Sequence, residues 1–332
     1  MGGTSRVAPL PPTDALEVAL ATLIDRAPEG DDWLHEIKLD GYRILARIER
    51  GTAQLSTRRG NDWTARAPSV TRALAALPVK NAVLDGELVS LRDDGVTDFQ
   101  SLQNALSEGR TDRLVYFAFD LLFLNGLDLR SLPLIERKEA LSLLLTRAKA
   151  DAHLRLSDHV VGDGARFFAQ ACQLGLEGII AKRARGPYRG GRSKDWLKIK
   201  CIARQEFVIG GFTPPSGSRK FLGALLIGVW DKQSLRYAGK VGTGFTERSL
   251  RALHTKLTPL VQAEAPFADP PKGSIVRGAR WVAPKLVAEI AFSEFTQDGR
   301  LRHPSFQGLR EDKAASEVVR ERKLRGAPPR RR

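Results

Sequence analysis

Apolar and polar side chains nearly alternate in several short runs between residues 33 and 200. Such alternation is typical of strands, because successive side chains of a strand point to opposite faces. Turns that contain Gly or Asp separate the runs. The strand runs are YRILARIE (42–49), AQLST (53–57), AVLDGELVSL (82–91), LVYFAFDLLFL (114–124) and EGIIAKR (177–183).

Other segments repeat their apolar positions with the spacing of an amphipathic helix. The strand runs of residues 33–200 cluster and do not alternate regularly with these helices. This favours an α+β fold with largely antiparallel sheets over a doubly wound parallel sheet. The predicted helices are ALEVALATLI (15–24), SVTRALAAL (69–77), FQSLQNAL (99–106), ERKEALSLLLTRAKA (136–150) and ARFFAQACQLG (165–175).

The pattern changes near residue 203, where a second set of strands begins. Five short strands with one helix in about 115 residues are typical of an OB-fold β-barrel. We therefore predict a first domain over 1–203, an OB-fold domain over 204–320 and a basic tail over 321–332. The strand runs are FVIGGFTP (207–214), ALLIGVW (224–230), LRYAGKVG (235–242), KLVAEIAFSEF (285–295) and LRHPSF (301–306), and the helix is RSLRALHTKL (248–257).

The charge balance points to a polyanionic partner. The 332 residues include 53 Lys and Arg against 38 Asp and Glu, a formal net charge of +15. Residues 320–332 carry seven basic residues and one acidic residue, so this segment supplies +6 and the remaining +9 lies elsewhere in the chain. Such an excess attracts nucleic acid.

The cysteines and the apolar runs bear on the compartment. Cys172 and Cys201 are isolated in the sequence, which predicts neither a disulfide nor a zinc site and suits a reducing compartment. No apolar run has the length of a membrane span, and the N-terminus lacks the apolar core of a signal peptide. We expect a soluble monomer without membrane contact in the cytoplasm, which in a bacterium gives access to the nucleoid.

The stretch HEIKLDGYR (35–43) contains the first candidate for chemistry. With a period of two, Glu36, Lys38 and Asp40 would share one strand face. A solvated face with paired charges is the usual explanation of a lysine between acids. A lysine nucleophile instead needs an unprotonated, exposed amine. The Asp-Gly turn would expose it, and Arg43 would add a fork that suits phosphate.

Five further motifs contain candidate site residues. Each alone has an ordinary explanation, namely a core aromatic residue, acids that cap turns, or lysines on a solvated face. The motifs are TRRG (57–60), LDGE (84–87), FAFDLL (117–122), EGIIAKR (177–183) and DWLKIK (195–200).

As an ordered set, these motifs resemble one superfamily. KxDGxR, an Arg-Gly turn, an isolated Glu, an aromatic-Asp strand, EGxxxK and KxK together resemble the covalent nucleotidyltransferases, and within them the ATP-dependent DNA ligases. The chain is most similar to the ligase module of bacterial DNA ligase D. The resemblance runs from about Asp32 to Val319 and includes KVGTGFTERSL (240–250) and GLREDK (308–313).

The resemblance implies a fold and a reaction. It implies a nucleotidyltransferase (ATP-grasp-like) domain with antiparallel sheets, followed by the OB-fold β-barrel. Lys38 would attack the α-phosphate of ATP and carry AMP through a phosphoramidate bond. AMP would then pass to a 5′-phosphate of nicked or broken duplex DNA, and the 3′-hydroxyl would displace it. Mg²⁺ or Mn²⁺ would assist, and end-joining proteins are expected partners.

The remaining site residues follow from the same resemblance. Glu36 would lie near the adenine edge, Phe119 would stack on the adenine ring, and Ile37 is a further residue expected to bind the nucleotide. Arg43, Arg58 and Glu87 would contact the ribose and the phosphates. Lys198 and Lys200 would contact the α-phosphate. Arg310 and Lys313, in the motif that also contains Asp312, would contact the leaving pyrophosphate. The metal would be held by Asp40, Glu87 and Glu177.

Several alternatives remain open from the sequence. An RNA ligase or a capping guanylyltransferase would use the same lysine, and labelling from GTP would identify the capping enzyme. A non-catalytic OB-fold protein that binds nucleic acid is a further alternative, although the intact lysines and glutamates argue against it. NAD is not expected as AMP donor, because two cysteines cannot supply the four-cysteine zinc module of NAD-dependent ligases. The choice between end joining and backup nick repair also stays open, as does a stand-alone ligase against a module of a larger enzyme.

Overall fold

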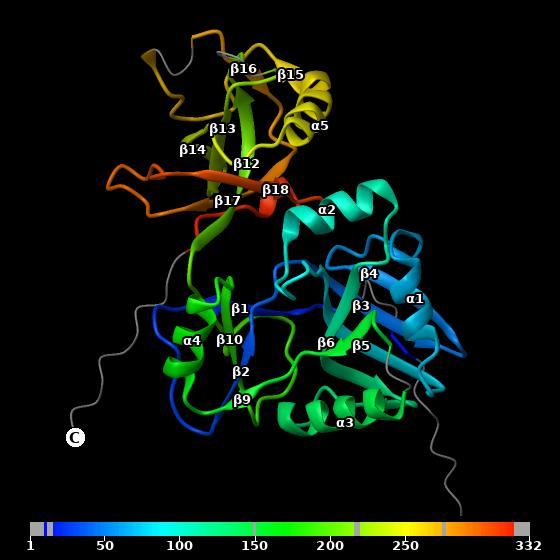
Figure 1. The fold of residues 1–332 in the computed structure, drawn as a ribbon. Helices are drawn as coiled ribbons and strands as arrows, with labels where there is room; N and C mark the ends of the chain where they lie inside the picture. Colours follow the sequence, from blue (N-terminus) through cyan, green and yellow to red (C-terminus); the bar gives the residue numbers. More distant parts are fainter. Residues whose placement is uncertain (1–9, 12–15, 149–150, 216–219, 274–276, 322–332) are drawn as a thin grey trace, which may run out of the picture. The chain divides into compact units, whose positions relative to one another are not determined.

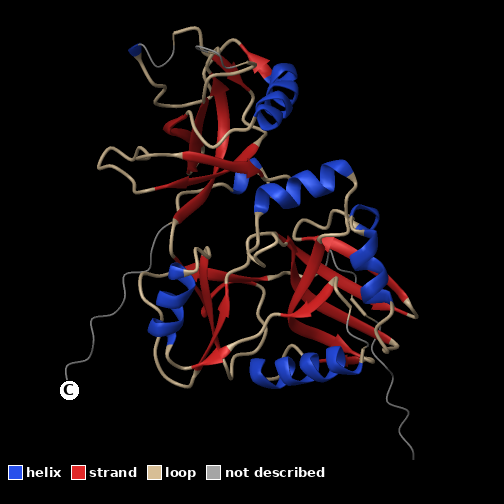
Figure 2. Cartoon of the chain, viewed as in Figure 1, coloured by secondary structure: helices blue, strands red, loops and turns tan. Residues whose placement is uncertain are grey.

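The protein is α+β with mainly antiparallel sheets, as predicted (Figures 1 and 2). The computed structural model describes residues 10–11, 16–148, 151–215, 220–273 and 277–321. These residues form two compact units, one within Met1–Cys201 and one within Ile202–Arg322. Residues 322–332 of the predicted basic tail lie outside the described residues.

A five-stranded sheet with the order β1-β11-β10-β2-β9 forms one half of the first unit. β1 runs parallel to β11, and the other neighbours are antiparallel. Helix α4 packs against β10, β2 and β9, and apolar side chains bury the face of the sheet on that side. The bounds are β1 Ala19–Leu23, β2 Trp33–Ile37, β9 Val160–Val161, α4 Gly164–Gln173, β10 Gly178–Arg183 and β11 Gly191–Lys200.

A second sheet, β4-β3-β5-β6-β7 with β8 paired to β6, forms the other half of this unit. Helices α1, α2 and α3 share a buried apolar cluster with its strands. α2 has clear end signals, because Asp98 caps its first turn and Gly109 ends it with a left-handed backbone. The bounds are β3 Tyr42–Glu49, β4 Thr52–Thr57, η2 Thr64–Arg66, α1 Pro68–Ala75, β5 Asn81–Ser90, α2 Phe99–Glu108, β6 Leu114–Leu124, β7 Leu127–Asp128, α3 Leu134–Arg147 and β8 Leu154–Leu156.

The second unit contains a seven-stranded sheet around one apolar core. Its path is β14-β13-β12-β16-β15, and β17 pairs with both β12 and β18. Between the ends of β14 and β18 the described residues form one bridge, Thr243 to Ser305, and no continuous ladder that closes a barrel. The bounds are β12 Ala203–Phe212, β13 Leu225–Asp231, β14 Ser234–Val241, α5 Glu247–Leu257, η3 Thr258–Leu260, β15 Val261–Gln262, β16 Arg280–Val282, β17 Val287–Phe292, β18 Ser305–Leu309 and η5 Ala315–Glu317.

The helix predicted over 15–24 is wrong, because Ala19–Leu23 is strand β1. The segment pairs in parallel with β11, and Arg43 donates a hydrogen bond of 2.8 Å to the Ala19 carbonyl. Ala and Leu favour helices, but pairing with a strand about 170 residues later in the chain overrides that weak preference. Strand β18 also begins later than the run predicted over 301–306.

The prediction that the cysteines form no disulfide is also wrong. Cys172 on α4 and Cys201, which follows β11, are joined by a disulfide with their Cα atoms 5.3 Å apart. The packing of α4 against the sheet brings the two residues together, and a separation of 29 residues in the sequence gave no sign of it. The cysteines therefore no longer support a reducing compartment.

None of the helices in the described part of the chain combines the length and the apolar character that crossing a membrane requires.

Candidate active site

One face of the first sheet carries three of the candidate side chains, Glu36, Lys198 and Lys200. The strand register sets Glu36, Ile180 and Lys198 opposite one another across β2, β10 and β11. Directly opposite residues share a face, and so do residues two apart along a strand. The α4 side is filled by the apolar residues that alternate with them. The other face therefore presents Glu36, Ile180, Lys182, Trp196, Lys198 and Lys200.

Lys38 follows the last residue of β2 and meets Glu177, which precedes β10. The Lys38 Nζ atom lies 2.5 Å from a Glu177 carboxylate oxygen, and the Lys38 N–H donates to the Gly178 carbonyl at 2.9 Å. Glu177 is buried, whereas the Lys38 side chain is 22% exposed. A side chain at Gly178 would collide with the Ile199 carbonyl. The amine is thus held against Glu177 and remains partly exposed.

The predicted Asp-Gly turn connects β2 to β3 directly after Lys38. Asp40 is buried, and its N–H donates to the Thr97 hydroxyl oxygen at 3.3 Å. A side chain at Gly41 would stand 2.2 Å from the Leu88 carbonyl oxygen, so glycine is required where the turn crosses β5. The turn is therefore fixed from two sides.

Glu36 lies in a buried ion cluster. Its carboxylate accepts hydrogen bonds from Lys138 Nζ at 2.8 Å, Lys182 Nζ at 2.9 Å and the Ser157 hydroxyl at 2.9 Å. Burial would raise the pKa of Glu36, but the positive charges of Lys138 and Lys182 outweigh it and the pKa is lowered. Burial also lowers the pKa of Lys182 to about 8, although Glu36 opposes that shift.

Two aromatic rings complete this face of the site. Lys182 Nζ lies 4.3 Å from the Phe119 ring centroid and 4.2 Å from that of Trp196, and the Arg43 guanidinium lies 4.9 Å and 5.2 Å from the same rings. These are cation–π distances. The rings stand edge to face with their centroids 5.8 Å apart. Flat surfaces and positive charges thus occur together, as a nucleotide site requires.

Arg43 uses its fork within the protein. It donates to both Asp85 oxygens, at 2.7 and 2.5 Å, and Asp85 also accepts from the Tyr188 hydroxyl at 2.6 Å. Burial would lower the pKa of Arg43, but Asp85 raises it well above its usual value. Its bond to the Ala19 carbonyl of β1 links the two sheets of the first unit, and Arg43 does not present an open fork in this structure.

Three other candidates lie on or next to β2, β4 and β5. Arg58 is exposed just after β4, and Glu87 is half-buried on β5, opposite Arg43 in the β3–β5 register. The Ile37 side chain packs into the apolar cluster on the α4 side of the sheet, so only its backbone is available to a ligand on the Lys38 side.

The candidates of the second unit are held by carboxylates of that unit. Arg310 lies 2.7 Å from Glu289 and 2.8 Å from Asp312, and Lys313 lies 3.0 Å from Glu206. Burial would lower the pKa of Arg310, but Asp312 and Glu289 raise it well above its usual value.

Asp40, Glu87 and Glu177 are the metal ligands predicted from the sequence. Among the described residues, no three His, Cys, Asp or Glu side chains are grouped so as to hold a metal ion. Glu177, the carboxylate beside Lys38, offers a hard oxygen donor. Mg²⁺ commonly takes one or two carboxylates together with water and substrate phosphates. The donor set suits such an ion when it arrives with a nucleotide.

Four side chains of the site are absent from the sequence prediction. Lys182 and Trp196 lie within quoted motifs, two residues from Ile180 and Lys198, so strand alternation is the signal from which they could have been assigned to this face. Lys138 and Ser157 had no comparable signal. A lysine in a charged helix is normally solvated, yet Lys138 is 2% exposed.

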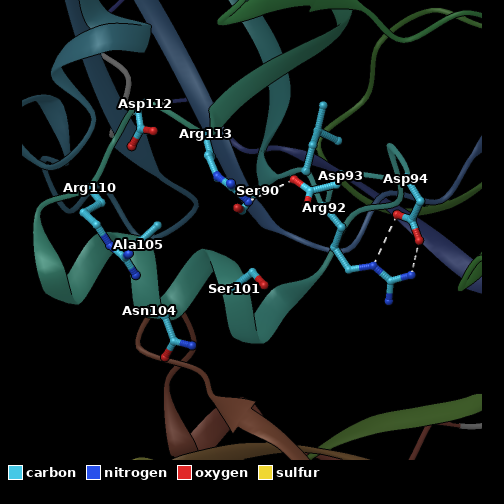
Figure 3. A pocket seen from close by; sticks show the side chains of 11 residues that line it. Ser90, Arg92, Asp93, Asp94, Ser101, Asn104, Ala105, Arg110, Asp112 and Arg113 are labelled. Atoms are coloured by element: carbon cyan, nitrogen blue, oxygen red, sulfur yellow. Dashed lines mark hydrogen bonds and ion pairs between the residues drawn. The ribbon is translucent and has the colours of Figure 1, made fainter.

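A separate hollow lies beside α2 in the same unit. Its volume is about 780 Å³. None of the candidates predicted from the sequence lines it. The lining residues are Ser90, Leu91, Arg92, Asp93, Asp94, Ser101, Asn104, Ala105, Arg110, Asp112 and Arg113 (Figure 3).

Comparison with known proteins identifies the family. Residues 14–200 match the family model described as ATP dependent DNA ligase domain, and residues 218–313 match ATP dependent DNA ligase C terminal region. The chain belongs to the ATP-dependent DNA ligases. The ligase resemblance read from the sequence is thereby confirmed.

Individual ligases support this assignment. The chain is 46% identical over 313 residues to the multifunctional non-homologous end joining protein LigD of Pseudomonas aeruginosa, covering 93% of this chain and 37% of that protein. It is 41% identical over 295 residues to the LigD of Mycobacterium tuberculosis, covering 88% of this chain and 38% of that protein. The chain thus spans less than two fifths of these relatives.

Solved structures of ligases resemble the fold. A mycobacterial DNA ligase D complexed with ATP and MES has 40% identity and a TM-score of 0.70, covering 93% of this chain and 99% of that one. The ligase domain of M. tuberculosis LigD has 41% identity and a TM-score of 0.52, with the same coverage of both chains.

Proposed function

We propose that this protein seals nicks in duplex DNA with ATP through a lysyl-AMP. In the first step the Lys38 nitrogen bonds to the α-phosphorus of ATP, the bond to pyrophosphate breaks, and the amine loses a proton. A DNA 5′-phosphate oxygen then takes the AMP, which breaks the P–N bond. Finally the 3′-hydroxyl attacks the 5′-phosphorus and AMP leaves. The observation that carries this proposal is the Lys38 amine, held by Glu177 at the edge of a sheet face that bears Lys182, Lys198 and Lys200.

The chain's own residues account for the chemistry of the first step. An ammonium cannot attack phosphorus, so Lys38 must first release a proton, and the Glu177 carboxylate at 2.5 Å is placed to accept it. Lys198 and Lys200 extend from the same face and neutralise charge on the α-phosphate. A divalent cation, when bound, supplies further charge neutralisation on the phosphates.

We assign the nucleotide contacts to the residues that match the family motifs. Phe119 stacks on the adenine, and Glu36 lies near its edge with the Ile37 backbone. We assign the adenylation reaction to the domain over 1–203 and the OB-fold motif to the domain over 204–320. Residues 321–332 are the basic tail. The remaining nucleotide contacts are assigned to Arg58, Glu87, Lys198, Lys200, Arg310 and Lys313. Arg43 is assigned to the nucleotide as well, although Asp85 engages its fork in this structure. Asp40, Glu87 and Glu177 are assigned to Mg²⁺ or Mn²⁺.

We further propose a role in the joining of broken DNA ends, in the bacterial cytoplasm at the nucleoid. The two LigD relatives are described as non-homologous end joining proteins, which supports this role and end-joining proteins as partners. The formal net charge of +15 suits a DNA substrate.

Sealing of a singly nicked duplex tests the proposal. The protein with Mg²⁺ or Mn²⁺ should join 3′-hydroxyl and 5′-phosphate ends with ATP but not with GTP. A nick with an RNA strand, compared with the DNA nick, separates a DNA ligase from an RNA ligase. Joining with GTP alone, or no joining of DNA with ATP in either metal, would overturn it.

A further inference from the structure

The hollow beside α2 is polar, and three arginines and three aspartates are among its lining residues. It lies between the turn that follows β5, one side of α2 and the segment that precedes β6 (Figure 3). Arg92, Arg110 and Arg113 line it, and Ser101 and Asn104 add neutral polar groups from α2. Arginine forks combined with neutral donors are the usual means of binding a phosphodiester.

The arginines are held by carboxylates at the surface. Arg92 donates to Asp94, and Arg113 lies 3.3 Å from Asp93, whose side chain is 93% exposed. Exposed ion pairs of this kind are weak. A guanidinium also carries more N–H donors than one carboxylate accepts. These pairs orient the forks, and a phosphate can replace the carboxylate at little cost.

The same elements support the turn that follows Lys38. Thr97, in the turn before α2, accepts the Asp40 N–H at 3.3 Å. From α2 itself, Gln103 donates to the Tyr42 hydroxyl at 3.1 Å, and the Phe99 ring lies 5.0 Å from the Tyr42 ring. The helix that lines the hollow and the turn before it therefore contact the segment that follows Lys38.

We infer that this hollow binds a phosphodiester of the DNA strand being joined, close to the nick. The inference rests on the proposed ligase function, in which a DNA 5′-phosphate must reach Lys38. The ligand is a nucleic-acid backbone and not the ATP triphosphate, because Lys198 and Lys200 project from the other sheet and line no part of the hollow. The DNA thus lies over α2 while its end enters the site.

The arginines and the carboxylates should have opposite effects on DNA affinity. The double variant Arg110→Ala with Arg113→Ala loses two phosphate contacts, so the Kd for nicked duplex should rise about tenfold or more. The slope of log Kd against log salt concentration should decrease by up to about two. Asp93→Asn removes a charge that competes with phosphate for Arg113, so the Kd should fall. Arg166→Ala, an exposed arginine on α4 over the other sheet, serves as the control and should change little.

Binding and catalysis are measured separately. The Kd is measured on the full chain with an inert nicked duplex that lacks the 3′-hydroxyl, at several salt concentrations, after thermal melting has shown that each variant is folded. Labelling from ATP should be unchanged in all variants. A Kd and salt slope of the double variant equal to those of Arg166→Ala, or an Asp93→Asn variant that binds DNA less tightly, would overturn the inference. A wild-type protein that binds DNA but is never labelled would instead refute the proposed function.

Discussion

Lys38 and Glu177 lie 2.5 Å apart although 139 residues separate them in the sequence. The contact joins the turn after β2 to the residue before β10, and the pairing of these strands holds both ends in place. A carboxylate at this distance forms an ion pair with the lysine and is the acceptor that we propose for the proton of the attacking amine. The distance between the two side chains is therefore a property of the sheet and not of a flexible loop.

Removing Lys138 should destabilise the first unit. The Lys138→Met variant leaves the buried Glu36 with only part of its positive partners, and breaking a buried pair in this way costs about 3–5 kcal/mol of unfolding free energy. Urea unfolding measures the loss. Arg147→Met at the exposed end of the same helix is the control and should cost less than about 1 kcal/mol. Equal losses in the two variants would show that the pair contributes no specific stability.

The local pattern was sufficient to predict most of the site-bearing strands. The run LVYFAFDLLFL coincides with β6 at both ends, and EGIIAKR overlaps β10. In both, the side-chain pattern and the packing agree, so local information decides the structure. The motif order also identified Lys38 and Glu177 as candidates, although only the fold shows that they touch.

The features that the sequence did not reveal depend on distant partners. Ala19–Leu23 has a helical composition but pairs with β11, and Cys172 meets Cys201 only through the packing of α4. Lys138 resembles a solvated helix residue until Glu36 is found beside it. Arg43 matched a phosphate fork, yet Asp85 engages that fork. In each case the deciding interaction joins segments remote in sequence, which local spacing does not encode.

Lys313 and Arg310 should respond differently to removal. Arg310→Ala strands the buried Glu289 and Asp312 carboxylates and should cost about 3 kcal/mol or more of stability. Lys313→Ala breaks a pair with Glu206 that is less buried and should cost about 1 kcal/mol or less. Thermal melting tests this contrast, and similar melting temperatures for the two variants would contradict it.

Lys313→Ala is consequently the better probe of the motif's role. Pyrophosphate leaves only in the first step, so a cation that stabilises it acts only there. The variant should be slow in self-labelling yet should seal a nick that already carries AMP on its 5′-phosphate at close to the normal rate. Equal damage to both reactions in the folded variant would exclude a role confined to the first step.

The disulfide should stabilise the first unit under oxidising conditions. A disulfide that closes a loop of 29 residues lowers the conformational entropy of the unfolded chain, which stabilises the folded state by about 3–4 kcal/mol. Cys172→Ser should lose about that amount in urea unfolding without reductant, and dithiothreitol should lower the wild type to nearly the level of the variant. A wild type that is indifferent to reductant would mean that the bond does not restrict the unfolded chain.

His35 should make stability fall on acidification. The His35 ring is fully buried, and neither ring nitrogen has a hydrogen-bond partner among the described residues. Burial lowers the pKa of His35 below its ordinary value of 6.5, although Asp163 opposes this shift. The unfolded chain therefore binds the proton more tightly, so the stabilisation is complete above pH 6.5 and is lost as the pH falls toward the folded-state pKa.

The variant His35→Leu isolates this effect. Urea midpoints about one pH unit above and one below 6.5 should differ less in the variant than in the wild type. His159, whose pKa is also lowered by burial, is present in both proteins and cancels in the comparison. The same pH dependence in both proteins would show that His35 is not responsible.

Covalent labelling at Lys38 tests the central claim most directly. The protein is incubated with α-labelled ATP and Mg²⁺ or Mn²⁺, denatured, digested and analysed by peptide mass spectrometry. Lys38→Arg keeps the charge next to Glu177 and removes the nucleophile, so it serves as the matched variant. The account predicts AMP on the peptide that contains Lys38 in the wild type and no label in Lys38→Arg. Label on another residue, or persistent label in a folded Lys38→Arg variant, would contradict it.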